Sequence, residues 1–243
     1  MRWHEDLSNA DIRPGETGTK PYLGPAPGVG ERGAAKNPEP QAFLVEMGSE
    51  TPTLRVHYHP VDQFQLFVRG GGRFGAHRVD RWTVHYSDRF TPYGPLLSDE
   101  DGLAFLTLRA ASNNGAFYMP EAREELAGSL ADVSGQPRRS STFALAEVAA
   151  TVDSSRWEDV ISADDGLRIV VGRVESSRPV IWPEIEGAGA YVILLSGQVL
   201  TGGLALGEGS IGWADPGDNA QGAESSTEGA TIALLQFPMK QAA

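Results

Sequence analysis

The stretch that decides the fold reads His57-Tyr58-His59-Pro60-Val61-Asp62-Gln63-Phe64-Gln65-Leu66-Phe67-Val68-Arg69-Gly70. Two histidines on alternate residues of one strand point to the same face. A polar side chain a few residues later can close a metal site, because imidazole and oxygen ligands suit iron, manganese, nickel or zinc. The pattern therefore predicts a metal site with His57, His59 and Gln63 as ligands. The chain has five histidines, none of them after His85, and no cysteine, so an imidazole-based site can exist only once.

Short segments with β-forming residues surround this stretch on both sides, and turn residues separate them. Turns are predicted at Gly48, at Gly70-Gly71-Gly72 and at Ser87-Asp88. Short strands with turns every 8 to 12 residues are typical of an antiparallel sandwich or barrel. The predicted strands span residues 42–46, 54–59, 64–68, 73–79, 82–86 and 103–108.

A helix and a linker divide this first β series from a second one. Residues 121–133 have the pattern of a helix, with acidic residues in the first turn, and residues 134–141 are predicted to be a linker. The second series begins near Leu167, and it has a predicted turn at Gly202-Gly203. Its predicted strands span residues 167–171, 180–182, 191–195, 211–213 and 231–237.

The two β series resemble a degenerate internal repeat, in which Gly70 corresponds to Gly197. Counting back from Gly197 as His57 lies from Gly70 leads to Glu184. The same count places Glu186 at the position of His59 and Ala190 at that of Gln63. We therefore expect no metal site in the second half. Glu184 and Glu186 should face solvent or the barrel rim, and apolar side chains such as Trp182, Tyr191 and Trp213 should close the interior.

These motifs resemble those of the cupin superfamily, specifically of a two-domain bicupin. The usual first motif is G-x5-H-x-H-x3/4-E-x6-G; His57, His59 and Gly70 match it, and Gln63 stands where Glu is usual. The usual second motif is G-x5-P-x-G-x2-H; Pro92 and Gly94 match it, but Leu97 occupies the position of the metal-binding His. The resemblance implies an all-β protein with two jelly-roll barrels in tandem and a short linking helix.

The resemblance also suggests how the chain is divided into domains. Residues 1–40, rich in Pro and Gly, are expected to form an extended arm, which either is a flexible tail or covers a sheet edge of its own barrel or of a second subunit. The first cupin barrel would span residues 41–120, the helix and linker 121–141, and the degenerate second barrel 142–243.

Several further residues are candidates for the site. Arg55 lies two residues before His57 and could either pair with a substrate carboxylate or lie at the barrel rim with a surface acid. Alternation places aromatic residues beside the site, and we take Tyr93, with Arg55, as a candidate catalytic residue. Because Leu97 cannot bind a metal, His85 or His77 could substitute as a ligand, and Asp62 could replace Gln63. Alternatively, Gln63 hydrogen-bonds a ligand and no metal binds.

The composition limits the possible partners and location. A formal net charge of −12 excludes nucleic acid and membrane surfaces as primary partners. The absence of cysteine excludes disulfides and thiolate chemistry. The chain shows no secretion leader and no apolar run long enough to span a bilayer. We therefore expect a cytoplasmic monomer or homodimer that binds a small-molecule substrate.

The resemblance implies a metal-dependent enzyme that acts on a small oxygenated organic molecule. A dioxygenase-like reaction is favoured, and a metal-assisted isomerase or lyase is the alternative within the same fold. The expected cofactor is one divalent transition metal, with Fe²⁺ favoured and Mn²⁺, Ni²⁺ or Zn²⁺ as alternatives. A third hypothesis, from another class, is a non-catalytic small-molecule-binding or sensor cupin.

Overall fold

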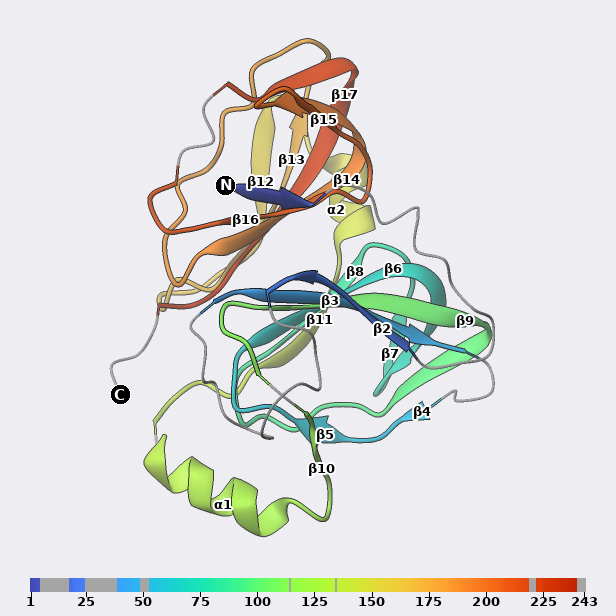
Figure 1. Ribbon diagram of the computed structural model, residues 1–243, viewed down its shortest axis with the longest axis vertical. Helices are drawn as coiled ribbons and strands as arrows, with labels where there is room; N and C mark the ends of the chain where they lie inside the picture. Colours follow the sequence, from blue (N-terminus) through green and yellow to red (C-terminus); the bar gives the residue numbers. More distant parts are fainter. Residues whose placement is uncertain are drawn as a thin grey trace. The chain divides into compact units, whose positions relative to one another are not determined.

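The computed structural model describes residues 1–4, 18–24, 39–48, 53–113, 115–133, 135–218 and 222–239 (Figure 1). The chain divides into two compact units. One unit runs from Ile12 to Ala144, and the other combines the N-terminal strand with Leu145–Ala243. Each unit is built on one large antiparallel sheet. We call the unit of residues 12–144 barrel 1 and the other unit barrel 2. Within the described residues, no helix is both long and apolar enough to cross a lipid bilayer.

Barrel 1 contains eight strands in the order β11-β8-β6-β9-β3-β2, with β4 paired to β9 and β7 paired to β6. A separate two-stranded ribbon joins β5 to β10, and the helix α1 (Arg123–Asp132) follows it. The strands span β2 (Gly18–Leu23), β3 (Gln41–Met47), β4 (Thr53–Leu54), β5 (His57–Tyr58), β6 (Gln63–Phe74), β7 (His77–Val79), β8 (Thr83–Ser87), β9 (Leu96–Arg109), β10 (Phe117–Tyr118) and β11 (Ser140–Ala144).

Barrel 2 contains seven strands in the order β1-β16-β14-β17-β13-β12, with β15 paired to β14. The helix α2 (Leu145–Thr151) precedes its main strands. The predicted strand over residues 180–182 is wrong: this segment is a loop, because Pro179 and Pro183 flank it and lack the N–H groups that a ladder needs. The strands span β1 (Arg2–His4), β12 (Arg156–Ser162), β13 (Arg168–Val174), β14 (Ala190–Thr201), β15 (Leu204–Leu206), β16 (Ile211–Ala214) and β17 (Glu224–Gln236).

The strand register confirms the internal repeat. In barrel 1, Gln63 pairs with Arg109 and Gly70 pairs with Leu103. In barrel 2, the residues 127 positions later pair in the same way, because Ala190 pairs with Gln236 and Gly197 with Ala230. The same offset relates β3 to β13 and β8 to β16. The β-bulge after Phe67 also recurs, after Leu194.

Two glycine pairs fix this shared geometry. Gly70 has φ +68°, and a Cβ added there would lie 2.1 Å from the carbonyl oxygen of Gly102. Gly197 has φ +74°, and a Cβ there would lie 2.1 Å from the carbonyl oxygen of Gly229. Only glycine fits at such a position. The predicted turn at residues 70–72 is wrong, because these glycines form a bulge inside β6 and the turn follows at residues 75–76.

The two units carry edge strands from unexpected parts of the sequence. In barrel 2 the outer strand beside β16 is β1, with Trp3 opposite Gly212 (Figure 1). In barrel 1 the corresponding place beside β8 is taken by β11, with Thr142 opposite His85. The strand β2 extends barrel 1 beside β3. Residues 1–40 thus contribute one strand to each barrel, and the rest of the expected arm, apart from residues 1, 24, 39 and 40, lies outside the described residues.

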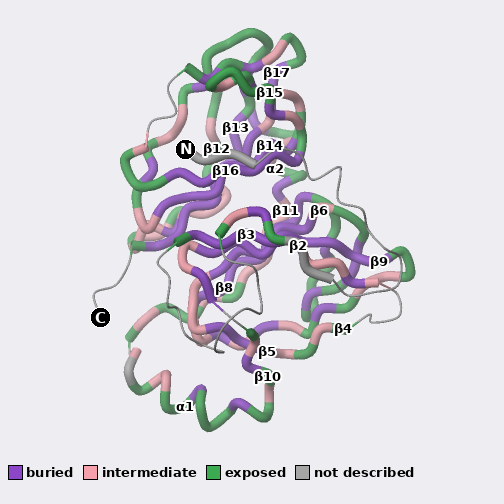
Figure 2. The backbone as a smooth tube through the Cα atoms, viewed as in Figure 1, coloured by how far each residue is buried: buried purple, intermediate pink, exposed green. Residues whose placement is uncertain are grey.

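Both barrels bury their central strands almost completely (Figure 2). The interior of barrel 2 is filled by small and branched apolar side chains, including Ala190, Val192 and Leu234. Tyr191 and Trp213 do not close this interior, contrary to expectation. Alternation along β14 places Tyr191 on the opposite face, where its ring packs 4.9 Å from that of Trp213.

Candidate functional site

The interior of barrel 1 is apolar at one end and polar at the other. The apolar end contains Phe67, Phe74, Leu96 and Phe105. At the polar end, side chains that lie directly opposite one another across β3, β9, β6 and β8 form two rows, and all of them are buried. The first row is Gln41, Arg109, Gln63 and Ser87, and the second is Phe43, Thr107, Gln65 and His85.

His57 and His59 lie together beside these rows, as predicted. Their ring centroids are 5.3 Å apart and their ring planes are nearly perpendicular. Backbone hydrogen bonds between His57 and Tyr93 tie this segment to the residues before β9. The ring of Tyr93 lies 4.6 Å from that of His57 and 6.4 Å from that of His59. The structure therefore brings together both predicted histidine ligands and one predicted catalytic residue.

Both histidines are neutral and oriented through Nδ1. His57 Nδ1 donates to the carbonyl oxygen of Arg55 at 2.7 Å, and His59 Nδ1 lies 3.0 Å from Asn113 Oδ1. Burial lowers the pKa of His57 to about 4 and holds the pKa of His59 well below its usual value, and the charge of Arg109 lowers both further. A neutral imidazole whose Nδ1 proton is held by an oxygen keeps a lone pair on Nε2.

Gln63 is fully engaged by its neighbours. Its Oε1 accepts hydrogen bonds from Arg109 Nε at 3.1 Å and Arg109 Nη2 at 3.0 Å. Its Nε2 donates to the hydroxyl of Tyr93. Burial raises the pKa of Tyr93, so this hydroxyl keeps its proton. Gln63 thus links the guanidinium to the phenol.

Arg109 is the central residue that the sequence did not indicate. It ends β9 and is buried, with a relative exposure of 3%. Its Nη1 donates to Gln41 Oε1 at 3.0 Å and to the carbonyl oxygen of Asn113 at 2.9 Å. Its Nη2 lies 3.3 Å from each ring nitrogen of His59. One guanidinium therefore organises most of the polar end.

These contacts test whether the residues fit the metal that the fold family implies. His57 fits, because its Nε2 lone pair is free of the Arg55 contact and its ring is neutral. The three-ligand set does not fit in this arrangement, because Arg109 places a positive charge against both His59 and Gln63 Oε1. Among the residues with described positions, no group of three His, Cys, Asp or Glu side chains could hold a metal ion.

The histidines proposed as substitute ligands lie elsewhere. His85 is buried in the second row, but its Nδ1 lies 2.9 Å from Thr142 Oγ1 and its Nε2 3.3 Å from Ser140 Oγ. Its ring packs 4.0 Å from that of Phe74, and burial lowers its pKa to about 3. His77 is exposed on β7. Neither joins His57 and His59 as a ligand in the structure.

Two other candidates point away from the interior. Arg55 does not share the face of His57, because residues 55 and 56 are not in a strand and the assumed alternation fails there. Its guanidinium is half-exposed and binds the Glu121 carboxylate at 2.6 Å. Leu97 does not face the site either. It lies at the start of β9 with 37% exposure, while Leu96 points inward.

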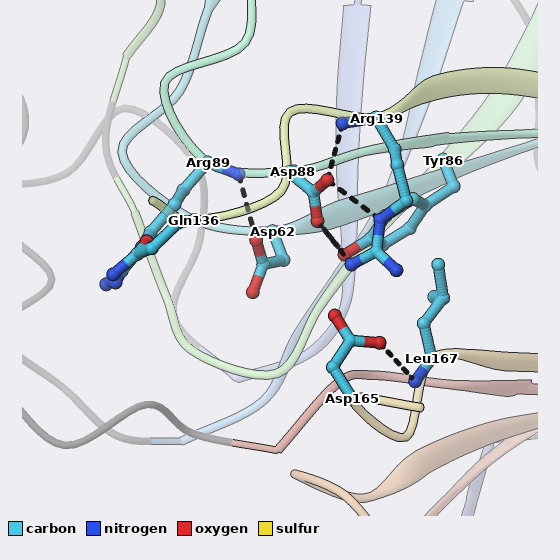
Figure 3. Close-up of polar contacts among 8 residues, drawn as sticks. All are labelled: Asp62, Tyr86, Asp88, Arg89, Gln136, Arg139, Asp165 and Leu167. Carbon is cyan, nitrogen blue, oxygen red and sulfur yellow. Dashed lines mark hydrogen bonds and ion pairs between the residues drawn. The ribbon is translucent and has the colours of Figure 1, made fainter. Parts of the chain in front are cut away.

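Asp62 belongs to a separate polar cluster outside the interior rows (Figure 3). Its Oδ1 accepts a hydrogen bond from the backbone N–H of Arg89 at 2.8 Å. Nearby, Asp88 pairs with Arg139 and accepts a hydrogen bond from the hydroxyl of Tyr86. Burial raises the pKa of Asp62 to about 6. Asp62 therefore does not replace Gln63.

In barrel 2, the positions that correspond to the histidines carry exposed acids. Glu184 and Glu186 are both exposed, as expected. The backbone N–H of Glu186 donates to Gln236 Oε1 at 2.8 Å. Gln236 corresponds to Arg109 in the repeat and is also buried. Barrel 2 thus retains one buried polar side chain at this end, bound to its own backbone.

Comparison with known proteins identifies the fold. No protein-family model matches the sequence, and no curated protein matches it. Among solved structures, a cupin 2 conserved barrel domain protein from Leptotrichia buccalis is similar, with 12% identity, a TM-score of 0.54, and coverage of 93% of this chain and 91% of that chain. A "putative dioxygenase" from Nostoc punctiforme is similar with 10% identity, a TM-score of 0.56, and coverage of 85% and 72% respectively. The chain therefore has the fold of the cupin superfamily, with two barrels in tandem.

Proposed function

We propose that barrel 1 binds a small oxygenated organic molecule at the polar end of its interior, and that barrel 2 is structural. The observation that carries this proposal is the contrast between equivalent positions in the two barrels. Four inward positions that are polar in barrel 1 are occupied in barrel 2 by residues without polar side chains. The pairs are Gln63 and Ala190, Gln65 and Val192, His85 and Gly212, and Thr107 and Leu234.

This contrast supports a binding role because polarity at these positions is not needed for the fold. Burying an amide or hydroxyl group costs about 1–3 kcal/mol unless a hydrogen bond compensates. Barrel 2 adopts the same register with an apolar interior. A polar interior that the register does not require is characteristic of a ligand site, where a few placed polar groups fix the orientation of a small molecule.

The groups at the polar end suit oxygen atoms of a ligand. Tyr93 keeps its hydroxyl proton, and Arg109 carries a permanent charge. The neutral ring of His57 offers an acceptor at Nε2, which can also take a proton from a bound molecule. Carbonyl, hydroxyl and carboxylate groups are the complementary partners for this set of donors and acceptors.

A metal-dependent enzyme is the second candidate, with a dioxygenase-like reaction favoured over an isomerase or lyase. The orientation of His57 supports it, since ligating histidines usually donate their other ring N–H to an oxygen. The likeness to the "putative dioxygenase" from Nostoc punctiforme is compatible with it. The cofactor would be one divalent metal, with Fe²⁺ favoured. For the three-ligand set to form, Arg109 would have to release its hydrogen bonds to Gln63 Oε1.

Two measurements separate these candidates. Metal content is measured in the wild type, in the His57→Ala/His59→Ala double variant and in the control His77→Ala, which removes an exposed histidine. Near one equivalent of metal in the wild type and control, lost in the double variant, supports the enzyme. Equal content in all three eliminates a metal at this histidine pair.

Ligand binding is tested by thermal unfolding with small hydroxy acids, keto acids and phenols. A compound at 100 times its dissociation constant should raise the melting temperature by about 5–10 °C. The shift should disappear in Gln63→Ala and persist in the barrel 2 control Val192→Ala. Equal shifts in both variants would contradict a site in barrel 1.

A further inference from the structure

We infer that Gln65 selects the ligand of barrel 1 by accepting a hydrogen bond from a hydroxyl group of that ligand at Oε1. The inference rests on the proposed function of barrel 1. Gln65 lies on the interior face of β6, between Gln63 and Phe67 in the alternation of the strand. It is opposite Thr107 on β9 and His85 on β8. It therefore lies next to the Arg109 row, one step further into the barrel.

The amide oxygen of Gln65 has no hydrogen-bond donor among the described residues. The residue is 2% exposed, and its buried Oε1 has no hydrogen bond to any residue whose position is described. Gln63, the preceding inward residue, is equally buried, but its Oε1 and Nε2 are both hydrogen-bonded. Buried acceptors are rarely left without a donor, so an unsatisfied one requires an explanation.

The neighbours of Gln65 are committed elsewhere. His85, directly across on β8, directs its ring nitrogens to Thr142 and Ser140 of β11. Its ring is packed against Phe74, so it is not free to turn toward Gln65. The hydroxyl of Thr107, on the other side, makes no hydrogen bond to this oxygen within the described chain. Among the described residues no group supplies a donor to this oxygen, and we assign the donor to the bound ligand.

The chemistry of the surroundings favours a hydroxyl group as this donor. An ammonium group would also donate, but Arg109 lies in the adjacent row and its charge disfavours a second cation nearby. A neutral hydroxyl carries no such penalty. The corresponding residue in barrel 2 is Val192, so the fold accepts an apolar side chain at this position. The amide of Gln65 is thus a feature of recognition.

The first test needs no ligand and compares two matched variants. Gln65→Met and Gln63→Met replace neighbouring inward amides by an apolar side chain of similar length. The melting temperature of Gln65→Met should stay the same or rise, because an unsatisfied acceptor is removed. That of Gln63→Met should fall by several degrees, because Arg109 and Tyr93 lose partners. An equal fall in both variants would show that Gln65 Oε1 is already satisfied, for example by an ordered water, and would overturn the inference.

The second test measures binding of matched compounds that differ by one hydroxyl group: lactate and propionate, malate and succinate, and 4-hydroxybenzoate and benzoate. In the wild type, the hydroxylated member of at least one pair should bind more than tenfold tighter, since a site built for a hydroxyl rejects the analogue that lacks it. In Gln65→Met the ratio should fall to about 1.

The outcomes separate the two proposals. An unchanged ratio in Gln65→Met would overturn the role of Gln65, while leaving the site in barrel 1 intact. A second result would also overturn the role of Gln65 and leave the site in barrel 1 intact. In it, Gln63→Met binds neither member of a pair, and Gln65→Met keeps the preference for the hydroxylated member. Absence of binding for every pair would count against the proposed function and the hydroxyl-bearing ligand class, and the melting temperatures would still decide whether Gln65 has a free acceptor.

Discussion

Barrel 1 and barrel 2 pair their central strands in the same register, with equivalent residues 127 positions apart, but their interiors differ in polarity. Shared glycines and a shared bulge keep the backbones alike. The inward side chains are free to differ, and barrel 1 uses them to bury amides, imidazoles and a guanidinium. The comparison shows that the shared register does not depend on the polarity of the inward side chains, which in barrel 1 are the residues of the proposed site.

The largest effect of a substitution is expected for Arg109→Gln, which gives barrel 1 the residue that barrel 2 has at Gln236. The change removes the donor of Gln63 Oε1 and a donor to the Asn113 carbonyl oxygen, and it leaves Gln41 Oε1 with the backbone N–H of Asn113. We expect a loss of about 3–5 kcal/mol in the free energy of unfolding, measured with urea, because each buried acceptor left without a donor costs about 1–3 kcal/mol. The control Arg168→Gln, a partly exposed arginine in barrel 2, should change it by less than about 1 kcal/mol. A small effect of Arg109→Gln would mean that the polar end does not depend on the guanidinium.

Acidification should destabilise barrel 1 more than barrel 2. The pKa values of His57, about 4, and His85, about 3, lie below the usual 6.5. Below pH 6.5 the unfolded chain binds protons that the folded chain does not, so stability that is present above pH 6.5 is lost as the pH falls toward these values. Asp62, with its pKa raised to about 6, acts in the opposite direction between about pH 6 and pH 4. His59, whose pKa is also held well below its usual value, adds to the loss, so at pH 5 we expect a net loss of about 4–5 kcal/mol.

Urea unfolding at pH 7.5 and pH 5.0, followed by hydrogen exchange with mass spectrometry, measures this loss and locates it. Residues 145–243 contain no histidine, so their peptides should keep their protection at pH 5 while peptides of β6 and β8 lose it. In His85→Leu the dependence on pH should be weaker. Equal loss of protection in both barrels would show that the buried imidazoles do not cause the difference.

A smaller loss in the free energy of unfolding is expected when a polar side chain is introduced into the apolar interior of barrel 2. Val192→Gln introduces an amide at the position of Gln65, among Ala190, Leu194 and Leu234. Without a partner this amide should cost about 1–3 kcal/mol in the free energy of unfolding. Leu200→Gln, at an exposed position of the same strand, serves as the control and should have little effect. If Val192→Gln is as stable as the wild type, the interior of barrel 2 also accommodates polar groups. The difference in polarity between the two interiors would then no longer support a ligand site in barrel 1.

The smallest effect is expected for Leu97→His. The family motif expects an imidazole at this position to complete a metal shell, but Leu97 is exposed and lies opposite Thr53 and Arg73. Metal content and melting temperature should therefore match those of the wild type. Tighter metal binding by this variant would show that the start of β9 can turn Leu97 inward.

Much of the fold could be predicted from local sequence, because alternating side chains and turn glycines act over a few residues. Gly70 and Gly197 identify the repeat for this reason. The strands β1 and β11 were not predicted. Arg2–His4 pairs with residues more than 200 positions away, and so short a segment carries no periodic signal.

The part of the site that could be predicted is the part whose polar side chains lie close together in the sequence. His57, His59, Gln63 and Tyr93 lie together, and the close spacing of the first three in sequence made them visible. Arg109 was missed because it comes 46 residues after Gln63 and ends an apolar strand. Its signal was the alternation of Leu103, Phe105, Thr107 and Arg109, which places all four side chains on one face. The prediction for Arg55 is wrong because it assumed strand alternation where residues 55 and 56 form no strand. The prediction for Leu97 is wrong because the family motif is one residue out of phase with the strand, in which Leu96 is buried and Leu97 is exposed.

The place of β1 at the edge of barrel 2 has a consequence for synthesis on the ribosome. Barrel 1 has all its strands once residue 144 has emerged, since β11 is its last element. The strand β1 is made first, but its partner β16 is made only at residues 211–214. At 5–20 residues per second, β1 waits roughly 10–40 s with its hydrogen-bonding edge open. The strand β1 is thus synthesised long before its pairing partner, and the nascent chain must keep β1 from pairing with other segments until β16 has been made.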